Sequence, residues 1–497
     1  MSPGFSIDWN LHAYSTGSYN DAVLELPDEL RNEMWQKVRR AIEEYSRELE
    51  HLRVAPPSDP RPVRRLLEDV DFSRPMSVGE ALDRVLEGLR HHQVHNGHPR
   101  YFGLFNPATS TMSVAADALA AAFNPQLAAW THAPFACEVE RLLIRELGVK
   151  FGYPRELVGG SFTTGGAEAN HTALLMALVR HFPRFVEDGV RSLPAQPTLY
   201  VSSESHHSFS KAARLCGLGT SAVRQVEVDE SFVMDPEALR ALVRDDRKAG
   251  RHPLFAVATL GTTGAGLVDP VDAIAHVGHE EGLWVHADAA WGGAAILVPE
   301  LRPLLQGVER ADSITFDAHK WLAVPMGAGM FFTRHPELLE EVFGVVAGYM
   351  PRAGEGIDVR EPHRSSMQWT RRFIGLKLFL TLLVAGFDGY ATMIREMVRL
   401  GDVLRERLTD GGWDIVNRTR LPVVCFCDRR APGTEAVRAI SDAVVESGDA
   451  WTSVTLVGGR IPALRACVTN FHTREIDLDF LLRCLSEARR RVLESIS

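Results

Sequence analysis

Between about Gly160 and Thr333 the sequence alternates short apolar runs with amphipathic stretches, and no other feature limits the fold as strongly. The apolar runs are TLYVSS, LFAVATLG, LWVHADAA, SITFDAHK and GAGMFFT. Runs that are apolar on both faces are typical of strands in a parallel or mixed sheet covered by helices. We therefore predict an α/β fold with a mostly parallel sheet flanked by helices.

The segments on either side of this region predict two further units. Apolar residues recur at helical spacing at 30–52 and 78–92, and the proline-rich linker VAPPSDPRP separates these two stretches. After about Lys377 a long helical pattern is followed by VVCFCD, a helix near 435–447 and ALRACVTNF, which is typical of a small α+β domain. The predicted division is a helical N-terminal arm and linker at 1–97, a large domain at 98–377 and a small C-terminal domain at 378–497.

Charge and composition favour a small-molecule partner. The formal net charge is −10 and long basic tracts are absent from the sequence, which disfavours binding to nucleic acid or to an anionic membrane. The sequence has no apolar run of about 18 residues and no basic segment followed by an apolar one at its start, so we expect no membrane partner. The 6 cysteines lack CxxC spacing, which predicts reduced thiols in a cytoplasmic protein.

Three segments at the ends of predicted strands carry the groups that an organic electron-sink cofactor needs. Lys320 follows the strand of SITFDAHKWL and supplies an amine, and Asp288 ends the strand of LWVHADAA and supplies a carboxylate for a ring nitrogen. Gly165 and Gly166 open a predicted helix, whose first amides suit a phosphate. The structural alternatives are a lysine that reaches solvent, an aspartate that caps a helix or forms a salt bridge, and an ordinary glycine before a helix.

Together these segments resemble the group II pyridoxal-5′-phosphate (PLP) decarboxylases, which include aromatic-L-amino-acid, glutamate, histidine and cysteine-sulfinate decarboxylases. The resemblance runs from about His98 to Tyr390, and its most specific element is HKW with an aspartate in the preceding DAA motif. It implies PLP-dependent transferase fold type I, with a seven-stranded type of sheet, and the conversion of an L-amino acid to its amine and CO₂. HKW indicates the aromatic branch. The alternatives are an acidic or other polar substrate, such as glutamate or 2,4-diaminobutyrate, an aldehyde synthase, and a non-catalytic binding paralogue.

The resemblance also implies roles around the cofactor. Lys320 is expected to be the Schiff-base lysine, Asp288 the partner of the pyridinium nitrogen, and His207 the imidazole stacked on the ring, with His206 the less favoured candidate. The other residues implied to surround the cofactor are Thr263, Ala290, Gly166, Ala167 and His319. Asp317 departs from the family, because the aromatic and glutamate branches usually have an asparagine there that reaches the phosphate. A carboxylate would repel that dianion unless it turns away, is protonated or pairs with a cation.

The stretch VFGVVAGYMPRAGEGID resembles the mobile loop of the family, in which a tyrosine delivers the proton that replaces the lost carboxylate. Tyr349 occupies that position, and a neutral tyrosine can donate such a proton. The alternative is a rim aromatic with only a packing role. The family further implies a homodimer with the active site at its interface, and an N-terminal arm that wraps the partner.

The substrate pocket is expected to lie at two loops before the predicted sheet. Phe105 and Trp130 are apolar wall candidates, whereas Asn106 and Gln126 suit a more polar substrate. The nearby stretch HHQVHNGH has histidine spacing that a metal cluster can use, but no cysteine or carboxylate cluster completes it. We therefore predict a solvated surface or an interface there, and no metal.

Overall fold

The computed structural model describes residues 24–345, 348, 358–430 and 433–496, and its residues form two compact units. One unit contains the described residues up to His95 together with Val445–Asp449. The other contains Asn96–Val444 and Ala450–Ser497. We describe each unit by itself, and the proposed site lies wholly in the second.

The first unit is helical, as the sequence predicts. Its helices are α1 (Asp28–Glu48), α2 (Pro60–Leu67) and α3 (Val78–His91), and a 3₁₀ turn at Leu49–His51 follows α1. The helix α2 begins inside the predicted linker, because Pro60 occupies its first turn and Asp59 accepts a hydrogen bond from the Arg61 amide. A capping box between Ser77 and Glu80 starts α3.

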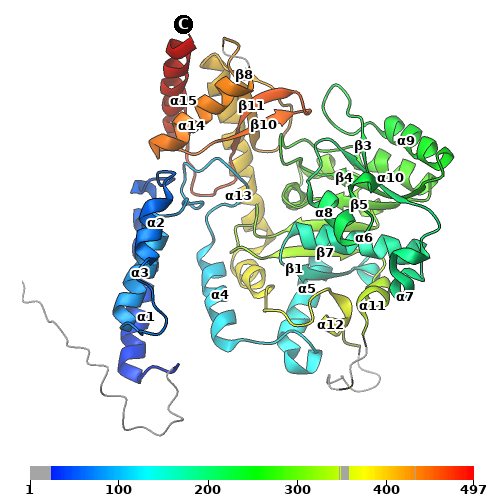
Figure 1. Ribbon diagram of the computed structural model, residues 1–497, viewed down its shortest axis with the longest axis horizontal. Helices are drawn as coiled ribbons and strands as arrows, with labels where there is room; N and C mark the ends of the chain where they lie inside the picture. Colours follow the sequence, from blue (N-terminus) through cyan, green and yellow to red (C-terminus); the bar gives the residue numbers. More distant parts are fainter. Residues whose placement is uncertain (1–23, 346–347, 349–357, 431–432, 497) are drawn as a thin grey trace, which may run out of the picture. The chain divides into compact units, whose positions relative to one another are not determined.

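A seven-stranded sheet forms the centre of the second unit (Figure 1). Its strands are β1 (Gly159–Thr163), β2 (Pro197–Ser202), β3 (Val223–Val226), β4 (His252–Thr259), β5 (Trp284–Asp288), β6 (Ser313–Asp317) and β7 (Gly329–Thr333). The order across the sheet is β1-β7-β6-β5-β4-β2-β3. Only β7 runs antiparallel to its neighbours, β1 and β6, and the other adjacent strands pair in parallel. The predicted mostly parallel sheet is confirmed.

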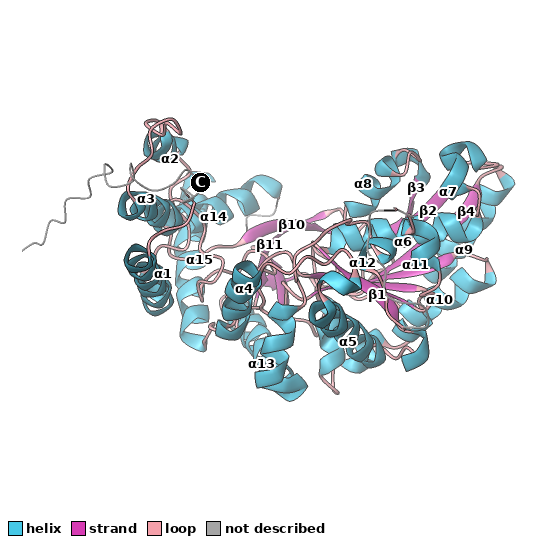
Figure 2. Cartoon of the chain, turned by 90° about the horizontal axis from the view of Figure 1, so that it is seen from below, coloured by secondary structure: helices cyan, strands magenta, loops and turns pink. Residues whose placement is uncertain are grey.

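Helices cover both faces of this sheet (Figure 2). The helix α6 packs on β4, β5, β6 and β7 together with α8 and α11, whereas α5, α9 and α10 contact the strands from the other side. The helices of this part of the chain are α4 (Thr111–Phe123), α5 (Pro134–Lys150), α6 (Gly166–His181), α7 (Phe185–Asp188), α8 (Ser208–Leu215), α9 (Pro236–Lys248), α10 (Val271–Glu280), α11 (Leu338–Phe343) and α12 (Pro362–Ser365).

A second, antiparallel sheet lies toward the C-terminus of the chain. It contains β8 (Asp414–Ile415), β9 (Val423–Cys427), β10 (Ser453–Val457) and β11 (Ile461–Cys467), in the order β10-β11-β9-β8. The helices near it in sequence are α13 (Leu376–Asp410), α14 (Thr434–Ser447) and α15 (Glu475–Ile496). The division predicted after residue 377 falls at the start of α13 and stays a prediction.

By length and composition alone, α13 is the one helix among the described residues that is long and apolar enough to cross a membrane. Such a helix is weak evidence for a span, since the core helix of a soluble protein passes the same test. The backbone of α13 leaves helical geometry at Gly386, where φ is 62° and ψ is −179°. Part of α13 packs inside the second unit, where the buried indole of Trp321 donates to the sulfur of Met397 on this helix.

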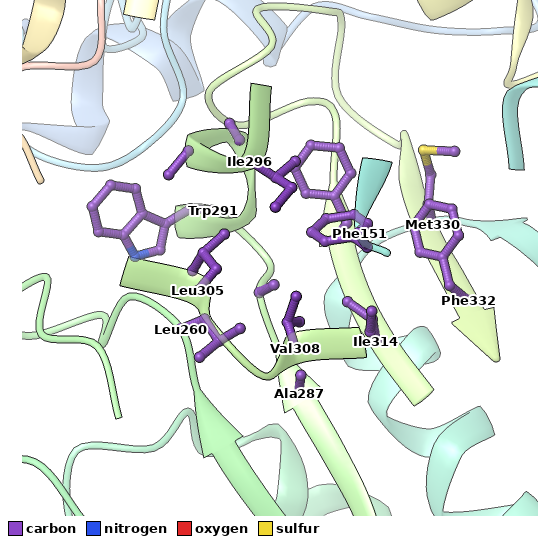
Figure 3. Close-up of a cluster of buried hydrophobic side chains, with 14 of the residues drawn as sticks. Phe151, Leu260, Ala287, Trp291, Ile296, Leu305, Val308, Ile314, Met330 and Phe332 are labelled. Atoms are coloured by element: carbon purple, nitrogen blue, oxygen red, sulfur yellow. The ribbon is translucent and has the colours of Figure 1, made fainter. Parts of the chain in front are cut away.

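The two faces of the large sheet bury different side chains, as strand geometry requires. On one face Ile314, Met330 and Phe332 pack near Phe151 at the end of α5 (Figure 3). On the other face Trp284 and Phe331 belong to the cluster beneath α6 and α8. Burial of an aromatic or branched side chain of this kind stabilises the fold by about 1.5–3 kcal/mol.

The face of β5 and β6 beneath α6 also carries polar side chains. His286 and Asp288 alternate with apolar residues along β5, and Ser313, Thr315 and Asp317 do the same along β6. All of them are buried. A buried polar stripe is costly unless its members bond to one another, so the interactions of these side chains identify what the stripe does.

Candidate active site

The candidate site lies at the edge of the sheet where the parallel strands end. Asp288 ends β5 and Asp317 ends β6, and these strands pair in parallel with Asp288 opposite Thr315. Ala290 links the two strand ends, because its amide donates to Asp288 Oδ1 at 3.2 Å and its carbonyl accepts from the Asp317 amide at 2.8 Å. Ligands of open α/β sheets bind at this type of edge.

Asp288 is a buried carboxylate, 5% exposed, with hydrogen bonds to both oxygens. Asn170 Nδ2 lies 3.0 Å from Oδ2, and Asn170 belongs to α6. Donors to both oxygens favour the ionised form of a buried carboxylate. Asp288 can therefore present a negative charge to a cationic group at this edge.

Lys320 lies in the turn that follows β6, and its amine is 3.1 Å from Asp317 Oδ2. The lysine side chain is 24% exposed, whereas that of Asp317 is 2% exposed. Of the three arrangements that the sequence allowed for Asp317, the structure has the pairing with a cation. The other oxygen of Asp317, Oδ1, is buried without a hydrogen-bond partner among the described residues.

The start of α6 packs closely against these strand ends at Gly166. A Cβ atom on Gly166 would lie 3.0 Å from Asp317 Oδ2, 3.3 Å from Thr315 Cγ2 and 3.5 Å from Ala290 Cβ. The amides of Gly166 and Ala167 start the helix and suit an anion, whereas the Glu168 amide donates to the Gly165 carbonyl at 3.1 Å. Two of the residues predicted around the cofactor, Gly166 and Ala290, are thus brought together.

His319 faces the same region. Its Nδ1 accepts a hydrogen bond from the Ala328 amide at 3.2 Å, so the hydrogen of the neutral ring is on Nε2, which lies 3.8 Å from Asp317 Oδ2. A Cβ atom on Gly165 would be 3.5 Å from His319 Cε1. The pKa of His319 is lowered from its ordinary value, because the effect of burial exceeds the opposing effect of the Asp317 charge.

The two adjacent histidines differ in their surroundings. The pKa of His206 is lowered from its ordinary value, chiefly by desolvation. The carboxylate of Asp288 opposes this shift, and the ammonium of Lys320 adds to it. His206 is thus within electrostatic reach of both groups. Both histidines are exposed in the cofactor-free chain, and His207 forms the N-cap of α8. The sequence favours His207 over His206, and that assignment stays a prediction.

Thr263 lies in the turn after β4, and the structure shows its contact through the backbone. Its carbonyl accepts a hydrogen bond from Arg465 Nη1, on β11. Arg465 Nη2 donates to the Gly103 carbonyl at 2.8 Å, and its guanidinium carbon lies 5.7 Å from the centre of the Phe105 ring. Arg465 therefore holds the Thr263 turn and the loop that carries Phe105.

Phe105 is buried and stacks on Trp291, with ring centres 4.3 Å apart and planes inclined by 13°. Trp291 contacts Trp321, the residue after Lys320, with ring centres 5.5 Å apart. An aromatic wall consequently leads from Phe105 to the turn of Lys320. The Phe105 loop thus reaches the strand ends, and its role in substrate binding stays a prediction.

The other predicted pocket residues contact different partners. Asn106 Nδ2 lies 2.9 Å from the sulfur of Met326, and Gln126 is exposed. Trp130 donates from its indole to Glu138 on α5 at 2.9 Å and from its amide to Glu361 at 2.6 Å. These described contacts do not join Gln126 or Trp130 to Lys320.

Tyr349, the predicted proton donor, lies outside the described residues. No group of three or more metal-ligand side chains occurs in the described part of the chain. Within the histidine-rich stretch, His95 bonds to the Tyr45 hydroxyl at 3.0 Å and to the Arg90 carbonyl at 2.9 Å.

Sequence reasoning missed the residues behind Asp288. Asn170 joins Asp288 to His286 and Thr315, and none of these three partners was singled out. A signal for the strand residues was present, because polar residues recur at every second position of β5 and β6 within otherwise apolar strands. Asn170 itself lies among the apolar positions of a helix. Its role can be recognised only from the structure, in which that helix packs on the polar side chains of β5 and β6.

The groups at this edge fit PLP. An amine, a buried carboxylate with donors to both oxygens and the close-packed start of α6 are the groups that the aldehyde, ring nitrogen and phosphate of that cofactor require. Gly166, where a Cβ would meet Asp317 Oδ2, lets the helix start approach the strand ends closely. The arrangement can hold an electron-withdrawing ring next to a substrate amine.

Comparisons with known proteins agree with this chemistry. Residues 64–429 match the family model described as the pyridoxal-dependent decarboxylase conserved domain. The chain is 31% identical to a tyrosine decarboxylase of Oryza sativa subsp. japonica, covering 93% of this chain and 91% of the relative. It is 30% identical to the cysteine sulfinic acid decarboxylase of Rattus norvegicus, with 85% and 88% covered.

A solved structure of a decarboxylase supports the fold assignment. The crystal structure of Oryza sativa TDC with PLP and tryptamine superposes with a TM-score of 0.88 at 26% identity, covering 95% of this chain and 99% of that one. The predicted fold type I architecture is therefore confirmed. The chain belongs to the pyridoxal-dependent decarboxylase family, and it is a PLP-dependent amino acid decarboxylase.

Proposed function

We propose that this enzyme converts an aromatic L-amino acid to the corresponding amine and CO₂. The observation that carries the proposal is the aromatic wall of Phe105, Trp291 and Trp321, which ends next to Lys320. Offset or stacked aromatic contacts favour a flat apolar side chain over a charged one. The similarity to a tyrosine decarboxylase over nearly the whole chain supports the same choice.

The roles proposed for the chain's own residues follow from the geometry above. PLP supplies an electron sink for the bond pair that the departing carboxylate leaves. Lys320 holds the cofactor through its amine, and Asp288 keeps a positive charge on the ring nitrogen. His206, rather than His207, faces the ring, since Asp288 and Lys320 act on it. Amides at Gly166 and Ala167, with His319, hold the phosphate.

Thr263 and Ala290 border the same space from the ends of β4 and β5.

Tyr349 is proposed to donate the proton that replaces the carboxylate, on the sequence resemblance of its loop alone. Tyr349→Phe removes only the hydroxyl. We expect amine formation to fall at least about 100-fold, because a positioned acid contributes roughly 10²–10⁴ in rate, while the PLP content stays the same. An unchanged amine rate would leave Tyr349 with a packing role.

An acidic amino acid is the second candidate substrate, and one observation favours it. Arg465 is 4% exposed and its guanidinium lies 5.7 Å from the Phe105 ring, so a buried cation is present beside the aromatic wall. Its bonds to Thr263, Gly103 and Ser453 leave some of its N–H groups for another acceptor. The similarity to a cysteine sulfinic acid decarboxylase agrees with this alternative.

The test is a substrate panel with the purified, PLP-loaded enzyme. L-tyrosine, L-tryptophan, L-phenylalanine, L-glutamate, 2,4-diaminobutyrate and cysteine sulfinate are compared by kcat/KM, following CO₂, amine and hydrogen peroxide. We expect an aromatic acid to exceed every acidic one by at least about tenfold, the discrimination that one apolar contact gives. Preference for an acidic substrate, lost in Arg465→Gln, would replace this proposal with the alternative.

Two controls sharpen the panel. Phe105→Leu keeps an apolar wall without a ring, and we expect it to raise KM for the aromatic substrate more than it lowers kcat. Thr198→Val, in the buried part of β2, removes a hydroxyl bonded to Tyr200 and should leave the order of substrates unchanged. Aldehyde and peroxide in place of amine would assign an aldehyde synthase, and no turnover on any substrate would contradict the proposal.

We further propose that two copies of the chain form a homodimer. The helices α1, α2 and α3 have no buried residue, and Trp35, Ile42, Val85 and Leu89 are all about half exposed. A helical arm with apolar residues of this size needs a covering surface. In the second unit Phe123 is 81% exposed at the end of α4, which supports the same partner.

Sedimentation equilibrium tests the dimer. We expect twice the chain mass for the wild type and a shift toward the chain mass for the double variant Trp35→Lys and Ile42→Lys. Arg40→Ala on the same helix is the matched control and should stay dimeric. A wild type that sediments as a single chain would contradict the proposal.

A further inference from the structure

Behind Asp288 lies a buried set of hydrogen-bonding side chains to which the proposed mechanism gives no role. These residues come from α6, β5 and β6, and we refer to them as the Asn170 network. Its members are Asn170, Trp284, His286, Ser313 and Thr315. Each is at most 3% exposed. A fully bonded buried network of this kind fixes the orientation of its members.

The acceptor role of the Asn170 oxygen fixes the direction of the network. The Thr315 hydroxyl donates to Asn170 Oδ1 at 2.6 Å, and His286 Nε2 lies 3.0 Å from the same oxygen. Because that oxygen only accepts, Nε2 has to carry the ring hydrogen. Burial lowers the pKa of His286 to about 4, so the ring is neutral above that pH and has one N–H.

The other ring nitrogen is consistent with this assignment. His286 Nδ1 lies 2.8 Å from Ser313 Oγ, and the indole of Trp284 donates to that same oxygen at 2.9 Å. Ser313 can therefore donate its own hydrogen to Nδ1, which is free to accept. The ring of His286 also stacks on Phe255, with ring centres 5.6 Å apart, which limits its rotation.

The locked oxygen determines what Asn170 offers to Asp288. With Oδ1 between two donors, Nδ2 lies 2.9 Å from Ser208 Oγ and 3.0 Å from Asp288 Oδ2. A reversed amide would place an oxygen against the carboxylate and leave two acceptors facing each other, which is unfavourable for an ionised Asp288. The amide orientation and the charge of Asp288 are thus linked.

We propose that Asn170, held in one orientation by His286 and Thr315, is the positioning residue that fixes the Asp288 carboxylate and favours its ionised form. This inference rests on the proposed role of Asp288 opposite the ring nitrogen of PLP, and it deepens that role. The positive charge on the ring nitrogen then depends on a hydrogen-bond chain that begins at Trp284, three side chains away from Asn170.

The charged and titratable groups that face Asp288 are few. His206 and Lys320 lie on the ligand side, and Asp317 acts on the same two groups. On the helix side Asn170 is the donor. The charge of Asp288 also opposes the lowering of the pKa of His286, which lies behind Asn170. A change at Asn170 leaves the ligand-side groups in place, so its effect on Asp288 can be separated from theirs.

The experiment measures the ring nitrogen directly. The full chain is loaded with ¹⁵N-labelled PLP, and the ¹⁵N chemical shift is followed with pH in the wild type and in Asn170→Leu. We expect the pH at which the ring nitrogen loses its proton to fall by about one unit in the variant. A shift of that size corresponds to the loss of one hydrogen bond to a charged group.

Two further variants keep the test decisive. Thr315→Val removes one of the two donors that hold the Asn170 oxygen, and we expect a smaller shift in the same direction even if Asn170→Leu does not fold. Thr198→Val, a buried threonine on β2, is the matched control and should give no shift.

The outcomes separate this inference from the function on which it rests. A wild type that binds no PLP would overturn the proposed function and the inference together. A wild type that binds PLP, with the same ring-nitrogen midpoint in Asn170→Leu or Thr315→Val as in the wild type, would overturn the inference and leave the function intact.

Discussion

Two buried carboxylates end adjacent strands of the large sheet, and they are held very differently. Asp288 on β5 has donors to both oxygens, from Asn170 and from the Ala290 amide. Asp317 on β6 pairs with Lys320 through one oxygen, and its other oxygen is buried without a hydrogen-bond partner among the described residues. The residues lie on the same face of the sheet, so the difference arises from their partners: Asn170 of α6 and the Ala290 amide for Asp288, and the Lys320 turn for Asp317.

Asp288 is a carboxylate held in one orientation, whereas Asp317 is a carboxylate whose partners can change. Asp288 is oriented before any ligand arrives, which is the condition for electrostatic stabilisation without reorganisation. Asp317 has an incomplete set of partners, and its cation is the amine that we propose to bind the cofactor. Asp317 therefore has to change partners when the site is loaded, whereas Asp288 does not.

The largest expected effect is on catalysis at Asp288. Asp288→Asn keeps the size of the side chain but removes the charge, and we expect kcat/KM to fall by about 10²–10³, the size of a buried charge pair that loses one partner. Asp317→Asn should change kcat/KM by less than about tenfold. Steady-state kinetics on the preferred substrate measures both, and equal losses would break the contrast.

The acid stability of the protein tests the neutral histidine behind Asp288. His286 has a folded pKa of about 4 against an ordinary value of 6.5, so the unfolded chain binds the proton first. Its contribution to stability is complete above pH 6.5 and is lost as the pH falls toward about 4. Over that window the unfolding free energy should fall by up to about 3 kcal/mol through this group.

His286→Gln removes the titrating group and keeps an N–H that can reach Asn170. Urea unfolding at several pH values compares the two proteins. We expect a shallower loss of stability in the variant over the same window. Parallel curves would mean that His286 is already protonated or exposed in the folded protein.

The cofactor-free protein tests how well each carboxylate is bonded. We expect Asp288→Asn to reduce the unfolding free energy by about 1.5–3 kcal/mol, because it loses hydrogen bonds to a charged group. Asp317→Asn should cost under about 1 kcal/mol, since one oxygen had no partner to lose. Denaturant unfolding without PLP measures both, and a larger cost at Asp317 would reverse the comparison.

The smallest effect concerns the Asp317–Lys320 pair itself. Lys320 is partly exposed, so solvent screens the interaction, and we expect a coupling free energy of about 1 kcal/mol or less. A double-mutant cycle of Asp317→Asn and Lys320→Met in the cofactor-free protein measures it. A coupling of several kcal/mol would show that Asp317 is as firmly held as Asp288.

Much of the fold and part of the site could be predicted because strand ends are visible in a sequence. The apolar runs before Asp288 and Lys320 placed both residues at one edge of a parallel sheet, where the structure has them. The α1 and α3 helices also follow their periodic patterns. A fully apolar strand with an isolated polar residue at its end is a strong local signal.

Other features depend on distances that a sequence does not contain. A sequence cannot rank the adjacent residues His206 and His207, because it does not show that His207 begins α8 or that His206 is within electrostatic reach of Asp288 and Lys320. Asn170 acquires its role only because α6 lies over the polar side of β5 and β6. The pairing of Asp317 with Lys320 likewise required the turn geometry between them.

Lys320 is the residue on which the proposed function depends most directly, because it is proposed to bind the cofactor. The PLP-loaded protein is reduced with borohydride, digested and mapped by mass spectrometry, with Lys320→Ala as the matched control. We predict a phosphopyridoxyl adduct on the peptide that contains Lys320, and none in the variant. An adduct on another lysine, such as the buried Lys377 of α13, or no adduct in a protein that retains PLP, would contradict the account.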